Sequence, residues 1–444
     1  MTQQGLPAQG LEERDGEAAA AVGRPGMVAS RRAILGGGLA LAAAACAPAS
    51  NAPPSNAPAS TAPPSAPPGS GPKGLQTASA HQLYTLPEDH QWHGGGIYDT
   101  GQLEEWFYWT GFLTDQDTQE QFGLFVNLFH EGDGPGKFSH RAWFSLDSLN
   151  NDSIVWATPS MTSFTAAVAP QSTSPNDFLY SGQGTDTMFE VTYLAQPDTW
   201  SVKFHGMGAN VPQPIDMAME LHTSTPYGYM PMTPYGMENE NQPWTGQADP
   251  ATMSSLSYYY GAPKTAANGT IKIGNQTHRL QGSLWMEHQW GNFLIPQTPW
   301  ASDYIWSALQ FDDGSIFTFR QWYGQNNQPL LNLGRHSYST PNNPTTYGFG
   351  QSVVFTPLKT WTSPVSKRNY PVYASVSSEF GTWYYSPVFP DYEMPFGYPP
   401  YGTSDLSIWE APCLLHTGSL TGPVVGKAYL ELPNILTKTF PVLT

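Results

Sequence analysis

Short runs in which hydrophobic and polar residues alternate, or in which aromatic residues accumulate, recur along most of this chain. Alternation with a period of two places apolar side chains on one face of a β-strand, whereas a helix needs apolar positions three and four residues apart. We find no convincing helical pattern in any window of about 12 residues or more. The sequence therefore predicts an all-β protein, with strands at 105–112, 121–129, 188–194, 200–205, 217–222, 270–273, 304–311, 315–323, 352–355 and 427–432.

Turn-forming residues separate these runs. We expect turns at Asp133-Gly134-Pro135-Gly136, Asn268-Gly269, Gly274-Asn275 and Asp312-Asp313-Gly314, because Gly, Asn and Asp adopt the backbone angles that tight turns require. Many short strands at close spacing are typical of sandwiches and barrels. One closed barrel is too small for all of them, so we expect two antiparallel β-barrels packed together. The polar segment 236–250 is the expected junction, which predicts an N-terminal barrel in 80–245 and a C-terminal barrel in 246–444.

The N-terminal region has a different pattern. Ser30-Arg31-Arg32 and the apolar small-residue run 36–45 are typical of a twin-arginine (Tat) signal peptide, which we place at 1–46. Cys46 follows Ala43-Ala44-Ala45 as in a bacterial lipobox, although the usual Leu three residues before the cysteine is missing. We expect export, lipidation of Cys46 and a membrane-tethered, extracytoplasmic protein. A short membrane anchor is the alternative, but the apolar run is far below the ~20 residues that span a bilayer.

Two further features concern this region. Acidic residues at 12–17 are unusual in a signal peptide, so translation can begin at Met27 instead of Met1. Residues 47–79 are rich in Pro, Ala, Ser, Asn and Gly, a composition that buries too little apolar surface to fold. We predict a disordered linker there.

Net charge and cysteine content limit which binding partners and which disulfides this chain can have. The formal net charge is −17 and the pI is about 4.9, which argues against a nucleic-acid partner because phosphates require a basic surface. Only Cys46 and Cys413 are present. If Cys46 carries a lipid, no intramolecular disulfide can form, and we expect Cys413 to be an inert buried thiol.

The segment 282–291, Gly-Ser-Leu-Trp-Met-Glu-His-Gln-Trp-Gly, holds the best candidate chemistry. A carboxyl group among indole rings loses hydration, so its pKa rises and it can act as an acid near neutral pH. In a strand, Trp285 and Glu287 share one face while His288 and Trp290 share the other. We take Glu287 as the candidate general acid. His288 is the alternative acid if the Glu287 face packs outward, and both residues can instead brace the junction through hydrogen bonds.

Other kinds of site have no support in the spacing of residues. Glu287 and His288 are adjacent, and we find no HExxH or CxxC motif, no Gly-rich phosphate loop and no Gly-x-Ser-x-Gly motif. We therefore expect no metal site and no cofactor.

Several blocks of the chain resemble, in order, those of the AttH-like, carotenoid 1,2-hydratase superfamily of lipocalin-like proteins. The first is Glu104-Glu105-Trp106-Phe107-Tyr108-Trp109-Thr110-Gly111-Phe112, similar to an EWWYFTGHL opening, and the central block is similar to G.AWMDREWG. The other matching blocks are 122–129, Tyr258-Tyr259-Tyr260 with Pro263, 306–314, Tyr370-Pro371-Val372, and Ile408-Trp409-Glu410 followed by 426–432. The resemblance as a whole spans roughly residues 92–432.

This resemblance implies two lipocalin-like barrels with a hydrophobic pocket at or between them, an apolar or prenylated ligand, and no cofactor. Members include hydratases of isoprenoid double bonds and pericyclic (Diels–Alder type) cyclases. The candidate substrate-binding residues are aromatic: Trp285, Trp290, Trp106, Tyr108, Tyr259 and Trp306. Ordinary core packing is the alternative for Trp106, Trp290 and Trp306. The family usually has Asp where this chain has Glu287, and the extra methylene displaces the carboxyl by about 1.5 Å.

Three functions fit these observations. The first is an exported hydratase, or a related lyase or isomerase, that protonates a C=C bond of a terpenoid or prenylated substrate. The second is a non-catalytic, lipid-tethered carrier of an apolar ligand. The third is a pericyclic cyclase, which depends more on pocket shape than on a strong acid.

Overall fold

The computed structural model describes most of the chain after residue 74. The described ranges are 75–77, 84–93, 104–134, 137–150, 153–157, 162–170, 174–184, 187–207, 216–224, 228–232, 237–239, 256–291, 303–323, 335–349, 353–364, 366–395 and 407–434. All of them belong to one structural unit, 68–444. The predicted signal peptide, Cys46 and most of the predicted linker lie outside them. No helix in the described ranges is long and apolar enough to cross a membrane.

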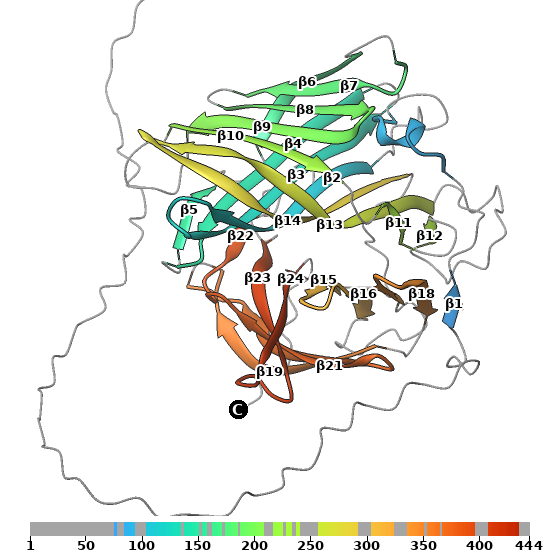
Figure 1. The fold of residues 1–444 in the computed structure, drawn as a ribbon, viewed down its shortest axis with the longest axis vertical. Coiled ribbons are helices and arrows are strands. Elements are labelled where there is room, and N and C mark those ends of the chain that lie inside the picture. Colours follow the sequence, from blue (N-terminus) through green and yellow to red (C-terminus); the bar gives the residue numbers. More distant parts are fainter. Residues whose placement is uncertain are drawn as a thin grey trace, which may run out of the picture. The chain divides into compact units, whose positions relative to one another are not determined.

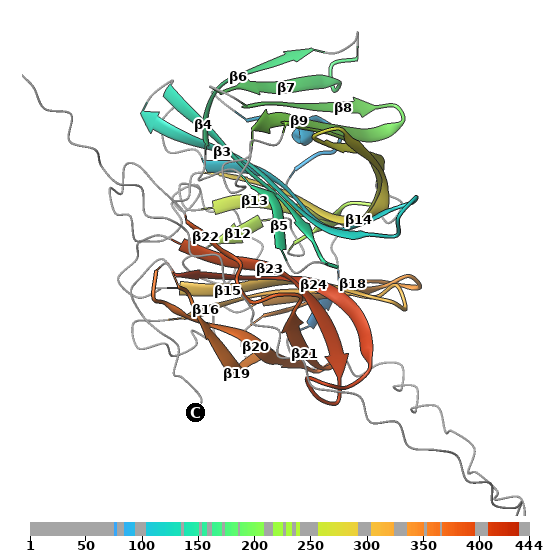
Figure 2. The same cartoon turned by 90° about the vertical axis from the view of Figure 1, so that its left-hand side faces the viewer.

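The described residues form two strongly curled antiparallel sheets (Figures 1 and 2), so the predicted all-β class is confirmed. The first sheet follows the order β10-β9-β8-β7-β6-β4-β3-β2-β14-β13-β11, with β12 beside β13 and β5 beside β4. Its strands are β2 (Glu104–Asp115), β3 (Gln121–Gly134), β4 (Lys137–Ser148), β5 (Ser153–Ala157), β6 (Thr162–Pro170), β7 (Phe178–Gln183), β8 (Thr187–Ala195), β9 (Asp198–Met207), β10 (Asp216–Ser224), β11 (Met230–Pro231), β12 (Met237–Asn239), β13 (Leu256–Ile273) and β14 (Gln276–Gly291).

The second sheet follows the order β1-β18-β17-β16-β15-β24-β23-β21-β20-β19, with β22 beside β23. Its strands are β1 (Leu75–Thr77), β15 (Asp303–Phe311), β16 (Ile316–Tyr323), β17 (Arg335–Thr340), β18 (Asn343–Phe349), β19 (Val354–Thr362), β20 (Asn369–Ser378), β21 (Gly381–Pro387), β22 (Glu393–Pro395), β23 (Ser407–Thr417) and β24 (Val424–Asn434). A short 3-10 helix, η1 (Glu88–His90), precedes β2.

Pairing between β10 and β13 joins the two ends of the first sheet into a ring. Gly269 of β13 lies opposite Leu221 of β10, and a Cβ on Gly269 would lie 1.8 Å from the Glu220 carbonyl oxygen. The Asn268-Gly269 pair is therefore not the predicted turn: this glycine lets two backbones approach within a long strand. Gly274-Asn275 and Asp312-Asp313-Gly314 do separate consecutive strands, whereas Asp133-Gly134 end β3 and residues 135–136 of the remaining predicted turn lie outside the described residues.

The boundary between the two sheets lies later in the sequence than the predicted junction at 236–250. β13 and β14 lie after residue 245, where we expect the second barrel to begin, yet both belong to the first sheet, and membership changes between Gly291 and Asp303. The reason is that β13 is needed to close the ring on β10. Leu75–Thr77, within the predicted linker, also form a strand, because they pair with the edge strand β18 and satisfy its backbone groups.

Two hydrophobic cores result. One fills the ring of the first sheet with residues such as Phe107, Trp109 and Trp200. The other contains the second sheet together with residues from the opposite face of the first, including Trp106 and Trp285. The first sheet therefore carries a core on each side over part of its area. Cys413 lies in the second core, and burial raises the pKa of its thiol.

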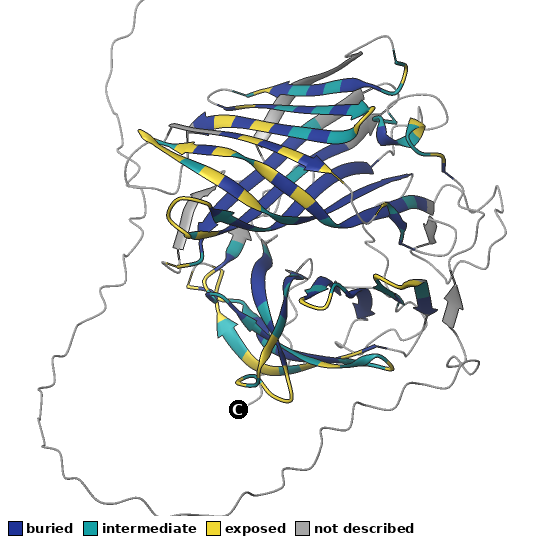
Figure 3. Cartoon of the chain, in the orientation of Figure 1, coloured by how far each residue is buried: buried dark blue, intermediate teal, exposed yellow. Residues whose placement is uncertain are grey.

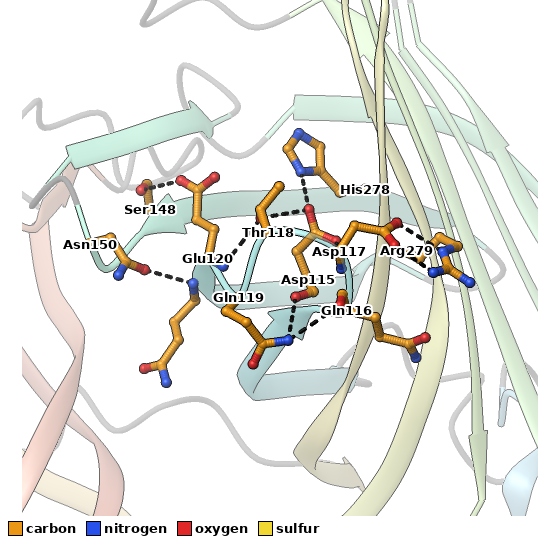
Figure 4. A network of polar contacts seen from close by, with 11 residues as sticks. Asp115, Gln116, Asp117, Thr118, Gln119, Glu120, Ser148, Asn150, His278 and Arg279 are labelled. Atoms are coloured by element: carbon orange, nitrogen blue, oxygen red, sulfur yellow. Dashed lines mark hydrogen bonds and ion pairs between the residues drawn. The ribbon is translucent and has the colours of Figure 1, made fainter.

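A polar network holds the end of β2. Figure 4 shows the Asp115 carboxylate accepting hydrogen bonds from Thr118 and from the His278 ring of β14, each at 2.8 Å. Arg279 forms an ion pair with Asp117 in the following turn. This network fixes the turn between β2 and β3.

Candidate active site

Strand β14 places Glu287 and His288 on opposite faces of the first sheet. From Leu284 to Gly291 every residue of β14 is buried, and Figure 3 shows that dark blue, buried stretches run through the middle of the first sheet. Side chains alternate between the faces of a strand. Trp285 packs in the core shared with the second sheet, whereas Met286 and Trp290 pack inside the ring. The predicted alternation of faces over this segment is confirmed.

Three aromatic donors surround the Glu287 carboxyl. Tyr259 Oη donates a hydrogen bond to Oε2 at 2.6 Å, and Trp285 Nε1 donates to the same oxygen at 2.8 Å. Trp106 Nε1 lies 3.4 Å from Oε1, at the limit of a hydrogen bond. The two carboxyl oxygens therefore have different surroundings, with Oε2 held more firmly than Oε1.

Strand β13 provides one of the hydrogen-bond donors to Glu287, Tyr259, and leaves room for a second donor, Trp285. Tyr259 and Gly261 are two residues apart, so they face the same side, and Gly261 lies directly opposite Glu287. A Cβ on Gly261 would lie 2.9 Å from Trp285 Cζ2. The glycine thus leaves room for the indole ring to lie beside the carboxyl.

The second sheet presents a row of large polar and aromatic residues to this region. In the strand register, Glu410 of β23 lies opposite Glu431 of β24, Glu431 opposite Trp306 of β15, and Trp306 opposite Arg320 of β16. Residues directly opposite one another in antiparallel strands share a face. Four adjacent strands therefore contribute neighbouring side chains to one face.

Two tyrosines donate hydrogen bonds to the glutamates of this row, Glu410 and Glu431. Tyr108, opposite Glu287 in β2, donates a short hydrogen bond across the sheets to Glu410. Tyr304 Oη donates to Glu431 Oε1 at 2.6 Å. The Arg320 guanidinium lies 4.9 Å from the centre of the Tyr304 ring. The carboxyl groups from the second sheet are therefore held by phenols and face the Glu287 region.

Burial raises the pKa values of all three carboxyls. For Glu287, hydrogen bonds from Tyr259 and Trp285 offset only part of the rise. Burial and the charge of Glu431 raise the pKa of Glu410 well above its ordinary value. Burial raises the pKa of Glu431 to about 7, although Tyr304 and Arg320 act in the opposite direction. The charge of Glu287 raises the pKa of both other glutamates, so the three groups form one electrostatic cluster.

Water retains slight contact with this cluster. Glu287 is 7% exposed, Arg320 7% and Trp106 8%, whereas His288 on the other face is 0% exposed. A group with a raised pKa and slight exposure can exchange protons with a bound molecule. The cluster has the residues for acid–base chemistry: a buried acid, a second carboxyl that titrates near neutral pH, and aromatic faces.

The opposite face of β14 carries a different polar group inside the ring. His288 Nε2 lies 2.7 Å from Glu105 Oε1, and His288 Nδ1 lies 3.1 Å from Tyr260 Oη. Burial lowers the pKa of His288 to about 4 despite the neighbouring Glu105. Trp290 stacks on His93 with ring centres 4.2 Å apart.

The structure therefore separates the two residues predicted to be catalytic. Glu287 lies in the core shared with the second sheet, and His288 lies inside the ring with Trp290. Five of the six predicted substrate-binding residues lie in the Glu287 core: Trp285, Trp106, Tyr108, Tyr259 and Trp306. Among these, Trp306 contacts both Trp285 and Tyr108 through its ring.

Sequence reasoning missed Glu410, Glu431, Tyr304 and Arg320 as members of this cluster. A signal exists for the two glutamates, because each is an isolated acid within an apolar strand, in Ile408-Trp409-Glu410 and Tyr429-Leu430-Glu431-Leu432. An acid at such a position is buried or faces a binding site. The register that brings the two strands together cannot be read from either segment alone.

Comparisons with known proteins agree on the fold. The profile of the family described as AttH-like matches residues 77–434. The chain is similar to the crystal structure of an AttH-like protein from Nitrosomonas europaea, with a TM-score of 0.60, 17% identity, and coverage of 81% of this chain and 100% of the other. It is also similar to kievitone hydratase from Nectria haematococca, with a TM-score of 0.50, 13% identity, and coverage of 81% and 97%. No protein of curated function matches the chain.

Proposed function

The chain belongs to the AttH-like family, and we propose that it is a hydratase that adds water to a carbon–carbon double bond of a hydrophobic, terpenoid or prenylated substrate. Glu287 is the proton donor in this proposal. Kievitone hydratase shares the fold, which makes hydration compatible with this architecture. Fold alone does not determine the reaction, so the argument rests on the site.

The observation that carries the proposal is the environment of the Glu287 carboxyl. It has a raised pKa, lies among Trp106, Trp285 and Tyr259, and interacts electrostatically with Glu410 and Glu431. Protonating an alkene requires a carboxyl group that carries a proton when the substrate binds, and burial shifts the pKa of Glu287 in that direction. A purely structural carboxyl needs hydrogen-bond partners but no second carboxyl that titrates near neutrality.

The asymmetry of the two oxygens suggests how the acid works. In the neutral acid the proton resides on Oε1, which has only the long contact to Trp106 among the described residues. The alkene π electrons take this proton and form a C–H bond, leaving a tertiary carbocation and the Glu287 carboxylate. Hydrogen bonds from Tyr259 and Trp285 to Oε2 then stabilise the new negative charge.

Water completes the addition. A water oxygen bonds to the cationic carbon, and Glu431, whose pKa is about 7, takes the proton that this water loses. Transfer of that proton back to Glu287 through the carboxyl cluster restores the starting state. The faces of Trp285 and Trp306 can stabilise the cation before water adds, because indole rings attract positive charge.

The test begins with the ligand. Mass spectrometry of an organic extract of the purified protein identifies what it carries, and the alkene so found is incubated with the protein in ¹⁸O-labelled water. We expect an alcohol that contains ¹⁸O. The Glu287→Gln variant should lose at least about 100-fold in turnover, because it cannot donate the proton, while still binding the ligand.

The matched control is Asp147→Asn. Asp147 is also a buried carboxyl that accepts a hydrogen bond from a tyrosine, Tyr392, in the segment between β21 and β22, so this variant measures the effect of altering such a pair away from Glu287. It should retain turnover. A Glu287→Gln variant as active as wild type would rule out Glu287 as the proton donor. An unmodified bound lipid with no conversion by either protein would indicate a carrier.

We further propose that the protein works outside the cytoplasm, held at a membrane by a lipid on Cys46. The twin-arginine pattern and the small-residue run before Cys46 support this. Cell fractionation should place the wild type in the membrane fraction and Cys46→Ala in the soluble extracytoplasmic fraction. Equal distribution of the two proteins would argue against lipidation.

A further inference from the structure

A second buried polar group, inside the ring of the first sheet, has no part in the proposed hydration. It consists of His93, Glu105 and His288, which come from the segment after η1, from β2 and from β14. One ligand atom from each of the three lies within 4.8 Å of the others. Two imidazoles and one carboxylate thus converge on a single point.

The contacts define which atoms converge. Glu105 Oε1 lies 2.9 Å from His93 Nδ1 and 2.7 Å from His288 Nε2. The His93 backbone N–H donates to Glu105 Oε2 at 2.9 Å and also lies 3.3 Å from Oε1. One carboxylate oxygen and two ring nitrogens are therefore left facing one another.

The outer nitrogen of each imidazole already has a partner. His93 Nε2 lies 3.2 Å from Asp89 Oδ1, and His288 Nδ1 lies 3.1 Å from Tyr260 Oη. Metal-binding histidines almost always donate their other ring N–H to such a group, which fixes the tautomer and aims the ligating nitrogen. Both histidines are thus oriented as metal ligands are.

Tyr260 allows the required tautomer of His288. Its hydroxyl lies between His288 Nδ1 and His90 Nδ1, which is 2.6 Å away. A phenol both donates and accepts hydrogen bonds, so it can accept a hydrogen bond from the His288 Nδ1–H while donating one to His90 Nδ1. In that tautomer His288 Nε2 would offer its lone pair to an ion, which would replace the 2.7 Å contact that Nε2 makes with Glu105 Oε1.

We propose that His93 Nδ1, Glu105 Oε1 and His288 Nε2 bind one divalent transition-metal ion, with Zn²⁺ as the simplest occupant. Two imidazole nitrogens and a carboxylate oxygen suit Zn²⁺ and its neighbours in the first transition row. The carboxylates of Glu105 and Asp89 would balance the charge of the ion. Because the side chain of His93 is 15% exposed while those of Glu105 and His288 are 0% exposed, water can complete the coordination from the His93 side.

The position of the ligands indicates what the ion does. His93 lies in the segment 84–93, whereas Glu105 and His288 are cross-strand neighbours within the sheet region formed by β2 and β14. An ion shared by all three would fasten that segment to the ring. It would lie on the face of β14 opposite Glu287, so its binding and the proposed hydration can be tested separately.

The experiment is a Zn²⁺ titration of the full-length chain, without a histidine tag and stripped with a chelator, followed by isothermal calorimetry. We expect one ion per chain and a higher melting temperature with Zn²⁺. His93→Ala should weaken binding by at least about 10-fold, and Tyr260→Phe by about 10-fold through loss of the outer partner. His93 is the least buried ligand, so His93→Ala is the variant most certain to fold.

Two controls isolate the site. His278→Ala removes a histidine from the same strand, β14, that also pairs with a carboxylate of β2, Asp115, at 2.8 Å (Figure 4). It should bind Zn²⁺ as the wild type does, and so should Glu287→Gln. No stoichiometric binding by the wild type, or equal affinity in His93→Ala, would overturn the proposal whatever the outcome for hydration.

Discussion

At the residue scale, the chemistry depends on how far the Glu287 side chain reaches. Its Oε2 meets Tyr259 and Trp285 at 2.6 and 2.8 Å, so the carboxyl is held at the full length of a glutamate. The resemblance to other AttH-like proteins places Asp at this position. The tyrosine and indole donors of this chain are placed for the longer residue.

Glu287→Asp tests this fit. Shortening the side chain moves the acid by about 1.5 Å, which is enough to cost about 100-fold in turnover. Steady-state kinetics on the substrate identified by extraction would measure it, with circular dichroism as a check on folding. Turnover equal to or above that of the wild type would mean that the donors are not matched to glutamate.

At the element scale, the ring of the first sheet depends on close approach of β10 and β13. Gly269→Ala would force a Cβ to within 1.8 Å of the Glu220 carbonyl oxygen, so the strands must separate. We expect a loss of about 3 kcal/mol in the free energy of unfolding, as for other overpacked positions. Urea denaturation would measure it.

The neighbouring Thr270→Ala is the matched control, because Thr270 is exposed and lies in the same strand. It should change stability by no more than about 0.5 kcal/mol. If the two variants are equally stable, the pairing of β10 with β13 does not hold the sheet together as described.

Local sequence explains some of these elements and not others. Successive side chains from Leu284 to Gly291 point to opposite faces of the strand. Because Glu287 and His288 are adjacent in sequence, their placement on opposite faces can be predicted once the segment is known to be a strand. Asn268-Gly269 predicts a turn from local propensity, but tertiary contact with β10 uses that glycine within a strand. The cluster around Glu410 and Glu431 depends on strand register, and His93, Glu105 and His288 come from three separate segments, so no local spacing reveals either group.

At the scale of the whole molecule, phenol–carboxyl hydrogen bonds cross between the two sheets. Tyr108 of the first sheet donates a hydrogen bond to Glu410 of the second, and Tyr392, in the segment between β21 and β22, donates one to Asp147 of the first. The carboxyl of Glu431 lies in the same region, near Glu287, Glu410, Tyr304 and Arg320. Contact between the sheets therefore depends on carboxyl groups whose pKa values burial raises.

This arrangement predicts how stability depends on pH. The pKa of Glu431 is about 7 in the folded protein and near the ordinary value of about 4.3 when unfolded. The native state therefore binds the proton more tightly. The stabilisation is complete below the unfolded pKa and is lost as pH rises through about 7.

Urea denaturation from about pH 5 to about pH 9 would measure this trend. The free energy of unfolding should fall across neutral pH in the wild type and fall less in Glu431→Gln, which stays neutral throughout. A wild-type stability that rises over this range, or an unchanged slope in Glu431→Gln, would contradict the assignment.

The most direct test of the central claim needs no substrate. Infrared difference spectroscopy of wild type minus Glu287→Gln at pH 7 reports whether this one carboxyl carries a proton. The account predicts the carbonyl stretching band of a protonated carboxylic acid in the wild type that is absent from the variant. A carboxylate band in its place would show that Glu287 is ionised at neutral pH and cannot be the resting proton donor.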